Sequence, residues 1–104
     1  MIQLLKKIFG SRESVDLKTL YQNGAVIVDV RTPGEFKSGH IKGAINVPLQ
    51  NLHNQVSSLK KLNKPVITCC LSGGRSGAAK NFLRQQGLEV YNGGGWASLQ
   101  AKIR

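Results

Sequence analysis

One short stretch of this 104-residue chain holds the residue types that nucleophilic catalysis requires. Cys70 ends an apolar run and is followed by glycines at positions 73 and 74 and then by Arg75. Glycines let the backbone curl until several N–H groups point inward, and such a ring at the start of a helix stabilises an anion. A thiolate held there has a pKa below the value of a free cysteine, about 8.5. We therefore predict that Cys70 is a reactive nucleophile and that Arg75 adds a fixed positive charge beside it. The predicted active-site loop consists of Leu71, Ser72, Gly73, Gly74, Arg75 and Ser76.

The two cysteines of the chain are adjacent, which limits what they can do. Cys69 and Cys70 cannot staple distant segments as a disulfide framework does, and their spacing does not match a zinc site. Because side chains alternate between the two faces of a strand, Cys69 should point away from the loop and pack in the core. An inert core thiol is the alternative for Cys70 too, since free cysteine is among the most buried residue types. A packing cysteine, however, does not need a Gly-Gly turn followed by an arginine.

Alternating apolar runs and helical patterns around this loop predict the elements that position it. The expected strands cover residues 25–30, 43–47, 66–70 and 88–91, and the expected helical segments cover 17–22, 33–36, 49–59, 77–86 and 96–103. Strands that alternate with helices form parallel sheets with ligand sites at the carboxyl ends of the strands. We predict an α/β fold, a small parallel sheet of about four to five strands flanked by helices on both faces, with Cys70 at the end of a central strand.

Three stretches of the sequence resemble signatures of the rhodanese-like domains. The amino-terminal signature consists of VDVR at 28–31, EF at 35–36 and GHIKGAINVP at 39–48. The loop CLSGGRS at 70–76 resembles the active-site loop of the family, and NGGGW at 92–96 resembles its carboxyl-terminal turn. The resemblance runs from about Val15 to Arg104 in the right order and spacing. We expect a rhodanese-like domain over residues 15–104, preceded at 1–14 by an amphipathic helix or tail.

The resemblance implies a sulfurtransferase. Cys70 would accept a sulfane sulfur from thiosulfate or a persulfide donor and pass it to a thiol or cyanide acceptor, while the backbone amides of residues 71–76 cradle the persulfide. Arg75 would help to bind an anionic donor and to hold the loop. Asp29 and Arg31 would be supporting polar residues near the site, with a structural salt bridge as the alternative. No metal and no organic cofactor is implied.

Two other function classes remain open. Cysteine-dependent phosphatases share the fold but have an active-site loop one residue longer, and the four residues between Cys70 and Arg75 match the sulfur-transferring loops instead. A non-catalytic rhodanese-like binding or regulatory module is the other alternative, although such modules usually lack the cysteine. Leu71 departs from the polar or basic residue of many thiosulfate-using members, so a persulfide is an equally reasonable donor.

The remaining polar and aromatic candidates have structural interpretations. His40, inside the amino-terminal signature, is expected to make a structural hydrogen bond, and His53 to be solvated on a polar helix face. Trp96 is expected to be a core or lid residue, because large aromatic side chains usually supply packing area.

Charge and hydropathy limit the partners and the location. The 15 Lys and Arg against five Asp and Glu give a net charge of +10, which attracts anionic small molecules and acidic partner proteins. The basic residues are scattered, with no aromatic-rich motif, so we expect no specific binding of nucleic acid. The longest apolar run, at 25–28, is far below the roughly 20 residues of a membrane span, and no secretory signal is evident. We expect a single cytoplasmic domain without a transmembrane segment that acts as a monomer.

Overall fold

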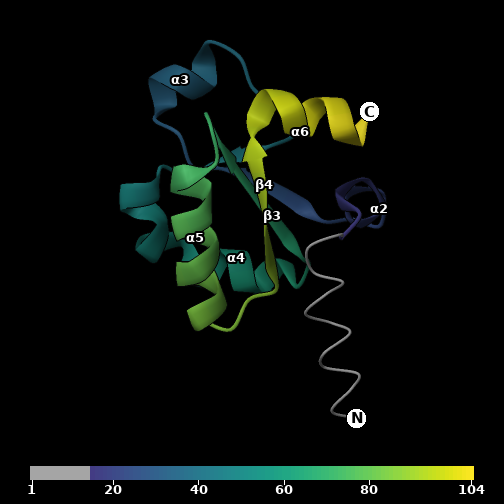
Figure 1. The fold of residues 1–104 in the computed structure, drawn as a ribbon. Coiled ribbons are helices and arrows are strands. Elements are labelled where there is room, and N and C mark those ends of the chain that lie inside the picture. Colours follow the sequence, from purple (N-terminus) through teal and green to yellow (C-terminus); the bar gives the residue numbers. More distant parts are fainter. Residues whose placement is uncertain (1–14) are drawn as a thin grey trace.

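Four parallel strands form the centre of the fold in the computed structural model, which describes residues 15–104 (Figure 1). They are β1 (Val26–Asp29), β2 (Ile45–Asn46), β3 (Val66–Cys70) and β4 (Val90–Gly95). The order across the sheet is β2-β1-β3-β4, so the chain turns in opposite directions after β1 and after β3. The crevice at the carboxyl ends of β1 and β3 is therefore the switch point where such sheets bind ligands. The predicted small parallel sheet is confirmed, and the helix or tail expected over 1–14 lies outside the described residues.

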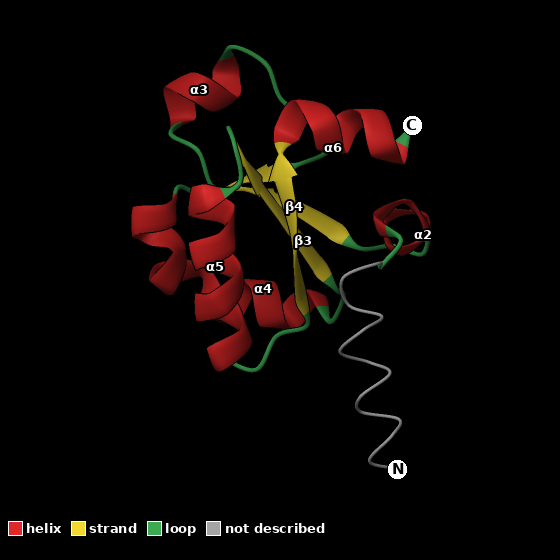
Figure 2. Ribbon diagram, viewed as in Figure 1, coloured by secondary structure: helices red, strands yellow, loops and turns green. Residues whose placement is uncertain are grey.

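Helices cover both faces of the sheet (Figure 2). The 3₁₀ helix η1 (Leu49–Gln55), α4 (Val56–Leu62) and α5 (Gly74–Gln85) lie on one face, and α2 (Leu17–Gln22) and α6 (Trp96–Ile103) lie on the other. The short helix α3 (Pro33–Lys37) stands beyond the carboxyl edge of the sheet (Figure 1). The flanking helices leave this edge as the place where side chains of several strands and loops can meet.

The strand β3 is buried on both faces, which is why its sequence is a continuous apolar run. Val66 and Cys70 pack into the core under η1, α4 and α5, whereas Ile67 and Cys69 pack into the core under α2 and α6. Adjacent side chains of a strand point to opposite faces, so the two cysteines belong to different cores. The structure thus places Cys69 away from the loop, as predicted.

Several element boundaries differ from those predicted. Helix α5 begins at Gly74 instead of residue 77, because Gly73, with φ of 108°, adopts a left-handed conformation that turns the chain directly into the helix. Ala78, expected on the inner face, is exposed, and Ala79 and Leu83 carry the packing of α5. The segment 49–59, expected as one helix, is split into η1 and α4.

The strand β4 continues to Gly95, beyond the expected end at Tyr91. Its last residues, Asn-Gly-Gly-Gly, have low strand propensity and were interpreted as a turn. They nevertheless pair with β3, with Asn92 opposite Thr68 and Gly95 opposite Cys70 across an irregularity in the register. A side chain at position 95 would not fit here, because a Cβ on Gly95 would lie 2.7 Å from the carbonyl oxygen of Leu71.

Among residues 15–104, no helix is long and apolar enough to cross a membrane. Within the same range, no three His, Cys, Asp or Glu side chains are grouped so that they could hold a metal ion.

Candidate active site

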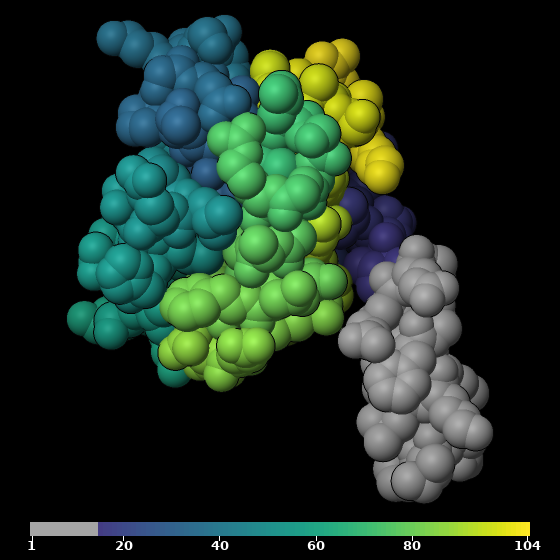
Figure 3. Space-filling model, turned by 60° about the vertical axis from the view of Figure 1, so that its left-hand side comes forward, coloured from purple at the N-terminus to yellow at the C-terminus, as the bar shows by residue number. Residues whose placement is uncertain are grey.

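The loop after β3 and the first turn of α5 surround the sulfur of Cys70 with hydrogen-bond donors. Cys70 is the last residue of β3 and is 1 % exposed. Its Sγ accepts the backbone N–H of Gly73 at 3.0 Å and that of Ser76 at 3.3 Å, and Ser76 Oγ lies 3.3 Å from the same sulfur. On the molecular surface this segment lies between α3 and the start of α6 (Figure 3). The arrangement is a cradle for an anionic sulfur at the carboxyl edge of the sheet.

The pKa values of the two adjacent thiols are shifted in opposite directions. Burial raises the pKa of Cys70, but the Ser76 hydroxyl and the N–H groups of the loop outweigh burial, so the pKa lies below the ordinary value. Burial raises the pKa of Cys69 to about 12, and the carboxylate of Asp29 acts in the same direction. Of the two thiols, Cys70 is therefore the one whose surroundings favour the thiolate.

Arg75 connects the loop to α3. Its guanidinium forms a two-pronged ion pair with Glu35, with Nη1–Oε1 and Nη2–Oε2 distances of 2.7 and 3.0 Å. The Arg75 side chain and Thr32 lower the pKa of Glu35 to about 2, so the pair is charged at all ordinary pH values. Glu35 is held in place because it closes a capping box with Thr32 at the start of α3. The positive charge predicted beside Cys70 is thus present but already paired.

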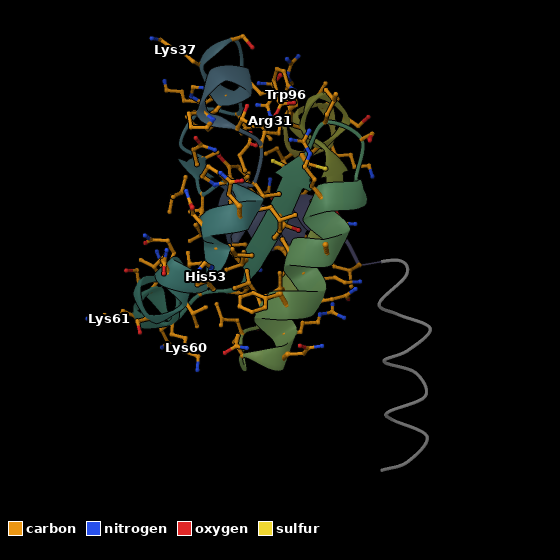
Figure 4. The ribbon with its side chains drawn as sticks, turned by 90° about the vertical axis from the view of Figure 1, so that its left-hand side faces the viewer. Arg31, Lys37, His53, Lys60, Lys61 and Trp96 are labelled. Atoms are coloured by element: carbon orange, nitrogen blue, oxygen red, sulfur yellow. The ribbon has the colours of Figure 1, made fainter. Side chains whose placement is uncertain are left out.

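Asp29 and Arg31 form a buried salt bridge at the end of β1. Arg31 donates from Nε and Nη2 to the carboxylate at 2.9 and 2.8 Å, and its Nη2 also donates to the carbonyl of Gly39 at 2.7 Å. The guanidinium lies over the ring of Trp96, 4.9 Å from the centroid (Figure 4). Asp29 is aligned with Cys69, on the face of the sheet opposite to Cys70. The geometry thus corresponds to the structural salt bridge, the alternative given for this pair.

Three polar side chains support the loop without having been predicted to do so. Thr68 Oγ1 donates to the carbonyl oxygen of Ser76 at 2.9 Å, and Ser76 Oγ donates to Asn92 Oδ1 at 2.7 Å. Glu35, the ion-pair partner of Arg75, is the third. Glu35 and Asn92 lie in the recognised signatures, and Thr68 is the one polar residue in the apolar run before the cysteines. These positions in the sequence could have marked the three residues as candidates, but they do not reveal which groups of the loop each side chain contacts.

The two histidines and Trp96 take no part in the cradle. His40 lies against the ring of Phe36, and its Nδ1 is 2.6 Å from the carbonyl oxygen of the same residue, the structural hydrogen bond that was expected. His53 is exposed on η1, far from the carboxyl edge (Figure 4). Trp96 is half-buried at the start of α6, where it packs between Arg31 and Gly39.

A pocket of about 290 Å³ lies beside the loop. It is lined by Val30, Thr32, Pro33, Pro48, Leu49, Gln50 and Arg75. Leu71, the residue after the nucleophile, is 61 % exposed. Apolar side chains thus form part of the surface beside the loop, together with the polar side chains of Thr32, Gln50 and Arg75.

The structure thus holds a cysteine in an amide-lined loop at the switch point of a parallel α/β sheet. The family model of the rhodanese-like domain matches residues 13–102, so this chain belongs to the rhodanese-like family. The predicted family is confirmed.

Individual relatives agree with this assignment. The chain is 42% identical over 82 residues to the uncharacterized protein YqhL of Bacillus subtilis, covering 77% of this chain and 64% of that protein. It is 39% identical over 74 residues to the thiosulfate sulfurtransferase GlpE of Ectopseudomonas mendocina, covering 70% and 67%. The crystal structure of a rhodanese-related protein from Thermoplasma volcanium superposes with a TM-score of 0.68 at 33% identity, covering 80% of this chain and 84% of that one.

Proposed function

We propose that this protein is a sulfurtransferase in which Cys70 carries a sulfane sulfur as a persulfide. The observation that carries the proposal is the cradle around Sγ, built from the N–H groups of Gly73 and Ser76 and from the Ser76 hydroxyl. These donors favour an anionic sulfur, which is both the attacking species and the product of the first step. The match to relatives named thiosulfate sulfurtransferase supports the same reaction class.

The reaction consists of two displacements at sulfur. In the first, the Cys70 thiolate attacks the outer sulfur of the donor; a new S–S bond forms and the donor's own sulfur bond breaks. Thiosulfate then leaves as sulfite, whereas a persulfide leaves as its thiolate. In the second, cyanide or a thiolate attacks the outer sulfur of the Cys70 persulfide, and the Cys70 thiolate is released as the leaving group. Both half-reactions conserve charge and need no cofactor, and ping-pong kinetics follow from the covalent intermediate.

The surroundings of the loop favour a persulfide over thiosulfate as the donor. Arg75 is the charged side chain of the loop itself, and its guanidinium is occupied by Glu35. Leu71 and the neighbouring pocket present apolar surface to an incoming molecule. A dianion gains little from such a surface, whereas the carbon part of a persulfide packs against it. The net charge of +10 attracts anionic donors of every kind, including thiosulfate and an acidic donor protein, and does not decide between the two donor classes.

Intact-mass spectrometry after exposure to a sulfane donor tests the proposal. We expect the mass to increase by one sulfur atom with a glutathione persulfide, and less completely with thiosulfate. The Cys70→Ser variant should gain nothing, and the matched Cys69→Ser variant should gain sulfur as the wild type does. Addition of cyanide should restore the original mass.

The outcomes separate the three function classes. A chain that takes no sulfur from either donor would support the binding or regulatory module. Turnover of an aryl phosphate that depends on Cys70 would support the phosphatase, which the short loop and the engaged Arg75 disfavour. Sulfur retained by Cys70→Ser and lost by Cys69→Ser would overturn the assignment of the nucleophile.

A further inference from the structure

Asn92 stands directly behind the hydroxyl group that faces the reactive sulfur. It lies in β4, and its side chain makes three hydrogen bonds to the active-site loop and to its own strand. Oδ1 accepts from Ser76 Oγ at 2.7 Å and from the N–H of Gly94 at 2.9 Å, and Nδ2 donates to the carbonyl oxygen of Gly73 at 3.3 Å. Asn92 thus binds both the loop backbone and the Ser76 hydroxyl, and in the described part of the chain it makes no hydrogen bond to Cys70 itself.

The partners of the Asn92 amide determine where the Ser76 proton lies. A backbone N–H can only donate, so the side-chain atom of Asn92 that faces Gly94 must be the oxygen. The same oxygen cannot donate to Ser76, and the Ser76 hydroxyl has a single proton, which it therefore gives to Asn92. A lone pair of Oγ is left facing Cys70, and in the thiol form the S–H group donates to it across 3.3 Å. The three groups form a directed chain from sulfur to hydroxyl to amide oxygen.

Ionisation of the sulfur reverses the direction of this chain. A thiolate has no proton to give, so a Ser76 lone pair facing it would be repulsive. Rotation of the hydroxyl turns its proton from Asn92 to the sulfur, and a hydrogen bond to a charged acceptor is stronger than one to a neutral amide. Asn92 Oδ1 keeps the N–H of Gly94 after the rotation, but the Ser76 and Asn92 oxygens, 2.7 Å apart, then face each other with lone pairs, so Ser76 Oγ must also move away from Asn92. The carbonyl of Gly73, 3.2 Å from Ser76 Oγ, is a weaker competitor, since it already accepts the N–H of Gly77 and the Asn92 amide.

We propose that Asn92 is a positioning residue that holds the Ser76 proton away from Cys70 while the sulfur is a thiol, and yields it when the sulfur becomes anionic. The residue would in this way limit how much anion is present in the resting protein and still allow full support of the anion during transfer. The proposal rests on the proposed use of Cys70 as a thiolate and persulfide.

The charged side chains on the neighbouring elements are already paired with one another. Arg75 is paired with Glu35 of α3, and Arg31 is paired with Asp29 of β1, on the other face of the sheet. The adjacent Cys69 thiol stays neutral, because burial raises its pKa to about 12. Among the described residues, Asn92 makes its hydrogen bonds to Ser76, Gly73 and Gly94 and to neither ion pair, so its substitution should change Cys70 through the hydroxyl or through the loop backbone.

The test measures the rate of Cys70 alkylation by iodoacetamide as a function of pH in a Cys69→Ala background. Asn92→Ala removes the competing acceptor, so the Ser76 proton is free for the thiolate. We expect the pKa of Cys70 to fall by roughly 0.5 to 1, the equivalent of one hydrogen bond. Asn92→Asp, which offers a stronger acceptor and a negative charge, should raise it.

Removal of the hydroxyl provides the control. In a Ser76→Ala background, Asn92→Ala should no longer change the pKa of Cys70. A merely structural role for Asn92 predicts the opposite sign, because loosening the loop withdraws its N–H groups and raises the pKa in both backgrounds. That result, or no change at all on Asn92→Ala, would overturn the proposal. Alkylation does not depend on sulfur transfer, so a chain that transfers no sulfur could still show the Asn92 effect, and the two proposals can fail separately.

Discussion

Cys69 and Cys70 are neighbours in the chain, yet their sulfur atoms lie in different environments. The strand alternation puts Cys70 in the core that ends at the loop, where N–H groups meet its sulfur. It puts Cys69 in the opposite core beside the carboxylate of Asp29, where burial and that carboxylate outweigh the positive charge of Arg31 and disfavour an anion. Which cysteine can act as the nucleophile thus depends on the face of the strand to which each side chain points and on the hydrogen-bond donors at the end of the strand.

The raised pKa of Cys69 predicts a loss of stability at alkaline pH. The folded-state value of about 12 exceeds the ordinary value of 9.0, so the unfolded chain releases the proton first. The neutral Cys69 thiol therefore makes its full contribution to the free energy of unfolding below pH 9. This contribution is lost as the pH rises from 9 toward 12. By pH 11 the loss should reach roughly 2 to 3 kcal/mol.

Urea unfolding between pH 8 and pH 11 measures this effect. The Cys69→Ala variant should have a shallower decline in the free energy of unfolding, whatever its stability at neutral pH. Identical slopes for the variant and the wild type would contradict the buried, neutral thiol.

The active-site loop is held by elements that come before and after it in the chain. Helix α3 contributes Glu35, whose carboxylate pairs with Arg75, and β4 contributes Asn92, which binds Ser76 and the carbonyl of Gly73. The capping box that starts α3 also orients Glu35, so a local helix signal serves the loop forty residues later. The loop geometry is therefore a property of three elements and not of the loop sequence alone.

The Glu35–Arg75 pair predicts an acid-dependent contribution to stability. The folded-state pKa of Glu35, about 2, lies below its ordinary value of 4.5, so the contribution is present above pH 4.5 and is lost as the pH falls toward 2. Glu35→Gln keeps an oxygen that can accept the Thr32 N–H, but it removes the charge and replaces the second oxygen that accepts from Arg75 with an NH2 group. We expect the difference in Tm between wild type and variant to be constant at neutral pH and to shrink to nothing near pH 2.

A difference in Tm that does not depend on pH would show that the charge of Glu35 is not what holds the loop. The two side chains are partly exposed, and added salt screens exposed charges. The difference in Tm between wild type and Glu35→Gln should therefore also decrease when salt is added.

At the scale of the whole molecule, the sheet order brings the carboxyl ends of β1, β3 and β4 to one edge, with α3 above it and α5 and α6 on either side (Figure 1). The close fit of β4 between β3 and α6 depends on Gly93, which is buried among Ile67, Thr68 and Leu99. Gly93 thus lets β4, the strand that carries Asn92, pack closely against the core that lies under α2 and α6.

Gly93→Ala should destabilise the protein by about 1 to 3 kcal/mol through overpacking. A Cβ there would lie 2.8 Å from Ile67 Cγ2, from Leu99 Cδ2 and from the carbonyl oxygen of Thr68. Gly34→Ala is the matched control, because a Cβ at that helical position meets nothing within 4 Å, and it should be neutral or slightly stabilising. Equal effects of the two substitutions in thermal unfolding would contradict the close packing of β4.

Much of the fold could be predicted because burial and helix termini leave local patterns. The apolar run 66–70 predicted β3 with its observed bounds, and the periodicity of 96–103 did the same for α6. The glycine-rich end of β4 was not predicted as a strand, since its residues favour a turn and only pairing with β3 makes them extended.

The sequence by itself determined the family, the sheet with its covered faces, and the loop that holds Cys70, because each depends on residue types at fixed local spacing. Only the tertiary structure decided which groups meet that loop. Arg75 binds Glu35, Asn92 accepts a hydrogen bond from the Ser76 hydroxyl, and Asp29 lies on the face of the sheet opposite to Cys70. These contacts join segments distant in the chain, and they form only when the order of the strands in the sheet brings those segments to the same edge.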